Sequence, residues 1–342
     1  STSTTFNSIS GGYSNSITAS TGRSSIVGGS AHQILGSGLA FIGGGNTNTV
    51  SCSYYGTIVG GVGHTVSAWA AFIGAGTSNS VSGGCAAVLG GTANTASGGG
   101  SAVGGGRNNT ASSTYATVSG GISNIASGVN STIGGGCNNR SCTNSSTVAG
   151  GRQNCAFGEA AAVAGGEVNR STGNYSFIGG GSGNTASGYM TVVAGGYNNT
   201  ASGDSAFVGG GGRPGCQNLA SGGFSAIAGG VNNTASGCYS VVAGGRQNTA
   251  NNFNTFIGGG RLNTTSANYS TIGGGQSNCA SGLVSTIGGG NANTASGYRA
   301  TISGGQNNTA SGNCATISGG QSNTASNAWS TVSGGCTNAA TA

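Results

Sequence analysis

Residues that could carry acid–base or metal chemistry are few in this chain. It has three acidic residues, two histidines, ten cysteines and no lysine. General acid–base catalysis and metal binding both need such groups within a few ångströms of one another. The candidates are His32, His64, Glu159, Glu167 and Asp204.

The spacing of these candidates argues against chemistry. His32 and His64 occupy a position that is Asn in nearly every other copy of an internal repeat, so we expect them to replace Asn structurally. They are two repeats apart, which is about 9–10 Å in stacked strands. Glu159 and Asp204 share another position three repeats apart, about 14 Å, too far for paired carboxylates. Because no G-x-x-x-x-G-K-[ST] motif is present either, we predict no enzyme, no metal and no cofactor.

The composition excludes several further classes. The 342 residues include 76 Gly and one Pro, and only 4% are charged, without a Gly period of three. This matches neither collagen nor a charged disordered chain. The net charge of +6 is spread along the chain, so we predict no nucleic-acid partner. No run approaches the ~18 apolar residues of a membrane span, and we predict no membrane insertion.

The chain is built from one repeat, marked by an Ile or Val two residues before a Gly-Gly pair. We call this Ile or Val position 0 and count the other positions from it. Position 0 is occupied 22 times, by Ile9, Ile26, Ile42, Ile58, Ile73, Val88, Val103, Val118, Ile133, Val148, Val163, Ile178, Val193, Val208, Ile227, Val242, Ile257, Ile272, Ile287, Ile302, Ile317 and Val332. We expect a single domain over 1–342, with irregular 15–17-residue coils over 1–87 and regular 15-residue coils over 88–342. A four-residue insertion near 211–216, which contains Pro214, predicts one bulging loop.

Fifteen residues suit one coil of an all-β, parallel β-solenoid with two short strands. We expect one strand around position 0 and a second over N-T-A-S, joined by corners at Gly-Gly and at G-x-x. Glycine supplies the positive φ or close backbone approach that such corners need. Alternation along the strands places position 0 inside beside a small residue two positions earlier.

Position +6 forms a predicted polar ladder inside the solenoid. Stacked amides can bond along the stack and to corner backbone groups. The ladder includes Asn94, Asn184, Asn293 and Asn308, with His32 and His64 in the two coils that lack Asn.

The ten cysteines do not stand at the same position in consecutive repeats, where a disulfide between stacked coils would form most simply. Cys142 and Cys155 come nearest, at about 8 Å, beyond the usual limit of about 7 Å. We predict mostly free thiols, which suits folding in a reducing compartment, with bridges between chains left open.

Two outward stripes are candidate contact surfaces. Position −1 is Thr in nine repeats and Phe in five, and is never charged. Because exposed apolar stripes usually mark interfaces, we expect its phenylalanines to lie between chains: Phe41, Phe72, Phe177, Phe207 and Phe256. A flat Thr-rich face is the alternative.

The second stripe lies at the G-x-x corner and is aromatic. Binding a partner and packing against a neighbouring chain both remain open for it. Its residues are Trp69, Tyr115, Tyr175, Tyr189, Tyr239, Phe253, Tyr269, Tyr298 and Trp329.

The phrase "NTASGxxSTISGG" resembles the Gly-Gly type of head repeat in trimeric autotransporter adhesins, the YadA-like heads, and repeats in viral and phage fibre proteins. The resemblance covers nearly the whole chain and implies a left-handed parallel β-roll, three chains side by side and an extracellular place on a cell or virion surface. The period of fifteen exceeds the fourteen of the simplest heads.

The sequence thus leaves three functions open. The first is a non-enzymatic surface fibre or adhesin head, a homotrimeric rod that contacts a host surface protein or glycan. The second is a self-assembling extracellular filament. The third is an ice-binding solenoid, since Thr271, Thr286, Thr301, Thr316 and Thr331 align in consecutive coils.

Overall fold

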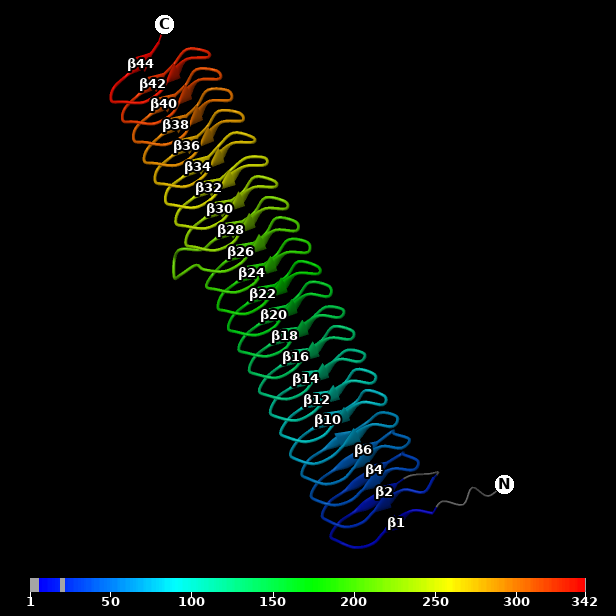
Figure 1. The fold of residues 1–342 in the computed structure, drawn as a ribbon. Coiled ribbons are helices and arrows are strands. Elements are labelled where there is room, and N and C mark those ends of the chain that lie inside the picture. Colours follow the sequence, from blue (N-terminus) through cyan, green and yellow to red (C-terminus); the bar gives the residue numbers. More distant parts are fainter. Residues whose placement is uncertain (1–5, 19–21, 342) are drawn as a thin grey trace. The chain divides into compact units, whose positions relative to one another are not determined.

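A computed structural model describes residues 6–18 and 22–341. The chain divides into two compact units, Ser1–Val168 and Asn169–Ala342. Each unit is a stack of short strands joined by corners, without a helix in the described residues (Figure 1). The predicted all-β parallel solenoid of about 22 coils is confirmed. The single domain stays a prediction.

Two sheets run along each unit, one made of odd-numbered strands (the odd sheet) and one of even-numbered strands (the even sheet). The odd sheet of the first unit comprises β1 (Ser8–Ile9), β3 (Ser25–Ile26), β5 (Phe41–Ile42), β7 (Thr57–Ile58), β9 (Phe72–Ile73), β11 (Ala87–Val88), β13 (Ala102–Val103), β15 (Thr117–Val118), β17 (Thr132–Ile133), β19 (Thr147–Val148) and β21 (Ala162–Val163). The even sheet comprises β2 (Ser16–Thr18), β4 (Gln33–Leu35), β6 (Thr49–Ser51), β8 (Thr65–Val66), β10 (Ser80–Val81), β12 (Thr95–Ala96), β14 (Thr110–Ala111), β16 (Ile125–Ala126), β18 (Arg140–Ser141) and β20 (Cys155–Ala156).

The second unit repeats this arrangement. Its odd sheet comprises β23 (Phe177–Ile178), β25 (Val192–Val193), β27 (Phe207–Val208), β29 (Ala226–Ile227), β31 (Val241–Val242), β33 (Phe256–Ile257), β35 (Thr271–Ile272), β37 (Thr286–Ile287), β39 (Thr301–Ile302), β41 (Thr316–Ile317) and β43 (Thr331–Val332). Its even sheet comprises β22 (Arg170–Ser171), β24 (Thr185–Ala186), β26 (Thr200–Ala201), β28 (Leu219–Ala220), β30 (Thr234–Ala235), β32 (Thr249–Ala250), β34 (Thr264–Thr265), β36 (Cys279–Ala280), β38 (Thr294–Ala295), β40 (Thr309–Ala310), β42 (Thr324–Ala325) and β44 (Ala339–Ala340).

Strands pair in parallel with the equivalent strands of neighbouring coils. Ile287 pairs in register with Ile272 on one side and Ile302 on the other, as the sequence predicted. This 15-residue offset fits the predicted repeat. Val208 instead pairs with Ile227, 19 residues later, because the extra residues loop out without shifting the register. That loop projects beyond the neighbouring coils (Figure 1).

Position 0 forms the apolar core of each unit. Its Ile and Val side chains are fully buried in nearly every coil, opposite a buried Ala at position +8 in most coils. Ile9 differs because it lies in the first coil and is 46% exposed. Burying one such side chain contributes about 1.5–3 kcal/mol, so stability is spread along the stack, one coil at a time.

Close packing of the corners explains why position +3 is Gly in every repeat. Gly275 has a φ of +86°, and an added Cβ would lie 2.1 Å from the carbonyl oxygen of Gly290 in the next coil. At position +2 the space is open, since an added Cβ on Gly274 would meet nothing within 4 Å. This open space explains why Ala75 can replace the first Gly of the pair.

The predicted Asn ladder is present, although it bonds mainly to backbone. Asn248 Nδ2 donates to the carbonyls of Gly244 and Gly260, each at 2.9 Å. Its Oδ1 accepts the backbone N–H of Asn263 at 3.0 Å. The predicted bonds to corner backbone groups are therefore present, and amides also bond along the stack where Asn278 and Asn308 donate to the Oδ1 atoms of Asn263 and Asn293. In addition, the amide oxygen accepts a backbone N–H of the next coil, which the sequence did not predict.

Candidate binding surfaces

Both histidines occupy the ladder, as predicted. The Nδ1 atom of His32 accepts the backbone N–H of Asn48, and that of His64 accepts the N–H of Asn79, each at 3.1 Å. An imidazole nitrogen therefore replaces the amide oxygen used elsewhere. Burial lowers the pKa of both rings below the usual 6.5, and hydrogen bonding with backbone groups offsets this only in part. Both rings are thus held neutral.

The outward side of the odd sheet is apolar over six consecutive coils of the second unit, from β23 to β33. We call this area the apolar face. It comprises Phe177, Val192, Phe207, Ala226, Val241 and Phe256 at position −1, with Gly179, Ala194, Gly209, Ala228, Ala243 and Gly258 at position +1. The register pairs place the position −1 residues side by side.

Each phenylalanine of the predicted inter-chain stripe lies beside a glycine. A Cβ added to Gly258 would lie 3.5 Å from the Phe256 ring, and one added to Gly43 would lie 3.3 Å from the Phe41 ring. These two rings therefore lie along the strand over position +1, and Phe256 is 42% exposed. The recurring Phe-x-Gly pattern is the sequence signal for this arrangement and was not recognised from position −1 alone. Phe41 and Phe72 belong to the first unit and lie outside the apolar face.

The even sheet of the second unit has a different outward side, which we call the hydroxyl face. Position +7 is Thr in eight coils and position +9 is Ser beside each of them except one. Its threonines are Thr185, Thr200, Thr234, Thr249, Thr264, Thr294, Thr309 and Thr324. Leu219 and Cys279 interrupt the column. Arg170 precedes it on β22.

The aromatic corner stripe is exposed, as a contact surface requires. In the second unit the rings of Phe224, Tyr239, Phe253 and Tyr269 form a continuous series with centroids 5.0–5.6 Å apart. Tyr175 and Tyr189 form a separate pair with centroids 5.7 Å apart. Phe224 was not in the predicted stripe. The exposed members outside these contacts include Trp69, Tyr115, Tyr298 and Trp329.

Comparison with known proteins does not assign the chain. Neither the protein-family models nor the curated proteins gave a match. The candidate surfaces therefore rest on their own geometry. In the described part of the chain, no helix has the length and apolar character needed to cross a membrane.

The remaining candidates are dispersed over the two units. Arg152 forms an ion pair with Glu167 in the next coil, where both side chains are about half exposed. Such a surface pair contributes at most about 1 kcal/mol. Glu159 belongs to the first unit and Asp204 to the second. The ten cysteines are exposed or partly exposed, and none is fully buried.

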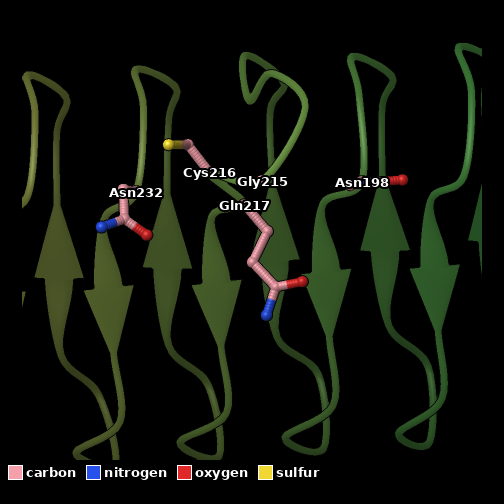
Figure 2. Close-up of a pocket in the computed structure, with 5 residues that line it drawn as sticks. All are labelled: Asn198, Gly215, Cys216, Gln217 and Asn232. Carbon is pink, nitrogen blue, oxygen red and sulfur yellow. The ribbon is translucent and has the colours of Figure 1, made fainter.

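The inserted loop borders a polar hollow of about 250 Å³ that is partly open to solvent. Its lining includes Cys216 and Gly215 from the loop, and Asn198, Gln217 and Asn232 from three consecutive coils. Figure 2 shows Asn198 and Asn232 on either side of the insertion, with Gln217 between them. An antiparallel bridge between Arg213 and Cys216 closes the loop on itself.

Proposed function

We propose that the chain is a non-enzymatic structural rod, part of a surface fibre or adhesin head in which three copies associate side by side. The apolar face carries this proposal. Twelve consecutive outward positions without one polar side chain form the kind of exposed patch that marks a protein interface. Glycine or alanine at position +1 beside every residue of position −1 in this face leaves room for close approach of a second sheet.

The resemblance to YadA-like heads supplies the number three, the left-handed coil and the display at a cell or virion surface. It also suggests a host surface protein or glycan as the partner. Thin solenoids gain stability from such association, because most coils bury only one branched aliphatic side chain and a few small ones.

The test compares two substitutions in one coil. Val241→Lys places a charge in the apolar face, and Thr249→Lys places the same charge on the hydroxyl face. Analytical ultracentrifugation should find three times the chain mass for the wild type and for T249K, and the monomer mass for V241K. A monomeric wild type contradicts side-by-side association. Growth without limit in both variants would instead support the filament.

The hydroxyl face favours a second candidate, ice binding. Its threonine hydroxyls form no hydrogen bond with other described residues, and they repeat at the ~4.8 Å spacing of stacked strands. A flat, uncharged array of this kind suits ordered water. Thermal hysteresis that T249K abolishes and V241K preserves would support it, and zero hysteresis at millimolar protein would discard it.

A further inference from the structure

The corner between the even and odd strands carries exposed apolar side chains in six consecutive coils of the second unit. We call this row the corner ridge. Its residues are 38–56% exposed: Phe224, Tyr239, Phe253, Tyr269, Leu283, Val284 and Tyr298. Six coils at a rise of about 4.8 Å give a ridge about 24 Å long. A continuous exposed row of this size needs an explanation, whereas scattered apolar residues do not.

Four of the five rings of the ridge are ordered by one another, and the fifth, Tyr298, packs against the Arg299 guanidinium, whose carbon lies 5.0 Å from the ring centroid. Phe224 and Tyr239 are stacked with an interplanar angle of 3° and centroids 5.0 Å apart. Phe253 meets Tyr239 and Tyr269 edge-on, at 5.5 and 5.6 Å. Because such pairs hold the rings in place before any ligand arrives, binding costs less side-chain entropy.

The backbone under the ridge does not favour these residues. Phe224, Tyr239 and Tyr269 have φ values of 57°, 57° and 59°. This left-handed region costs a bulky residue about 1–2 kcal/mol, and Gly or Asn tolerates it better. Gly100 and Asn254 occupy the same corner position in other coils, also with positive φ. Aromatic rings are therefore present here against the local backbone preference, which points to a role for the rings themselves.

Uncharged polar groups accompany the rings. Asn268 Oδ1 accepts the backbone N–H of Phe253 at 3.2 Å, and both Asn254 and Asn268 are exposed. Three of the rings carry tyrosine hydroxyls. In these six corners, 222–224 to 297–299, Arg299 is the single charged residue.

We propose that the corner ridge binds an extended neutral oligosaccharide. A pyranose ring has an apolar C–H face that packs on an aromatic ring, and hydroxyls at its edge that bond to amides and phenols. Each coil advances by about one pyranose unit along the ridge. The proposal deepens the surface-fibre function above and rests on it, by naming the ligand class of that surface.

Two other partners fit less well. An apolar protein surface would bury the tyrosine hydroxyls and asparagine amides without partners, at about 1–3 kcal/mol for each group. Single-stranded nucleic acid also stacks on aromatic rows, but it needs a positively charged groove beside them, and Arg299 alone does not provide one.

The experiment uses the intact chain and three soluble probes: cellohexaose, maltohexaose and chitohexaose. Saturation-transfer NMR identifies binding, and titration calorimetry measures it. The double substitution Tyr239→Ala with Phe253→Ala should weaken binding of the preferred probe by about tenfold or more. Tyr239→Phe keeps the stacked ring and should lose less. Trp329→Ala removes the most exposed ring of the same corner, outside the ridge, and should change nothing.

Three results would overturn the proposal. One is the absence of binding by all three probes at millimolar concentration. Another is an equal loss in W329A and in the double variant, which would make the contact non-specific. The third is stronger, salt-sensitive binding of hexagalacturonate, which would make charge the determinant. Circular dichroism confirms that each variant is folded. If the oligomer persists but no saccharide binds, the saccharide proposal is wrong and the proposed rod function is unaffected.

Discussion

Replacing Asn248 with Ala should open the solenoid locally. The side chain is fully buried and makes three hydrogen bonds, two to Gly244 and Gly260 and one from Asn263. Gly260 keeps a second donor, the N–H of Arg246 at 2.9 Å. The substitution therefore leaves mainly the buried N–H of Asn263 and the carbonyl of Gly244 without partners. At about 1–3 kcal/mol for each orphaned group, the coil should lose about 2–5 kcal/mol.

A second variant shows how much of this loss in stability comes from the accepted hydrogen bond and how much from the two donated ones. Asn248→His should keep the bond from Asn263, as His32 and His64 do for their neighbours, and lose the two donated bonds. At pH 8 it should therefore be intermediate between N248A and the wild type. Asn251→Ala, three residues along the same coil and exposed, is the matched control and should change stability by less than about 0.5 kcal/mol.

Hydrogen exchange measured by mass spectrometry is the suitable assay, because long repeat arrays do not unfold in two states. Opening free energies should fall in peptides covering the coils of Asn233, Asn248 and Asn263, and stay unchanged several coils away. If N248A and N251A lower these free energies equally, the ladder does not hold the coils together and our account of it is wrong.

Three further predictions follow from single contacts. The folded structure lowers the pKa of His32 and His64. Their coils should therefore be fully stable above pH 6.5 and lose stability as the pH falls below it, because the unfolded chain then binds more protons than the folded chain. Hydrogen exchange at pH 8 and pH 5 should show this loss of stability, and the double substitution His32→Asn with His64→Asn should abolish it. Gly275→Ala should cost more than about 2 kcal/mol, given its positive φ and the Gly290 carbonyl oxygen 2.1 Å from the added Cβ, whereas Gly274→Ala should cost less than about 0.5 kcal/mol. Similar opening free energies for the two variants in hydrogen exchange would contradict the packing argument. The Ser240 hydroxyl is buried without a hydrogen-bond partner, so Ser240→Ala should raise the local opening free energy by about 1 kcal/mol. Ser270→Ala removes a hydrogen bond to the Ala267 carbonyl and should not raise it.

Much of the fold could be predicted because each coil repeats the same physical solution. Position 0, the Gly at +3 and the Asn at +6 recur with little change. Position 0 supplies a buried aliphatic side chain, the Gly adopts a positive φ, and the Asn supplies a buried amide. The stacking of Ile272, Ile287 and Ile302 follows directly from their spacing. The donor that each Asn amide oxygen accepts from could not be predicted, because a sequence does not show whether that oxygen meets a side-chain or a backbone N–H.

The candidate surfaces were harder to predict because they depend on which neighbours an outward residue meets. The Phe stripe was found by its position, but the glycine two residues after each Phe was missed, since the pattern spans two outward positions of one strand. The corner aromatics were read as one stripe. In the structure Phe224 joins Tyr239, Phe253 and Tyr269 in one series, while Trp329 belongs to the same corner without joining it. Ring contacts depend on side-chain rotamers, which repeat spacing does not specify.

The interior of the solenoid restricts its residues more than the outward sides of the two sheets and the corner ridge do. The interior positions must be nearly constant, because a wrong residue at +3 or +6 disturbs the next coil as well. Positions −1, +7 and +12 touch only their neighbours on the same face, so each can vary without disturbing the core. The apolar run Phe177–Phe256 ends where the threonines Thr271–Thr331 begin on the same sheet. Such a sharp change along one column, over an unchanged core, means that the core does not determine the residues at position −1, which is what the proposed contact with another chain requires.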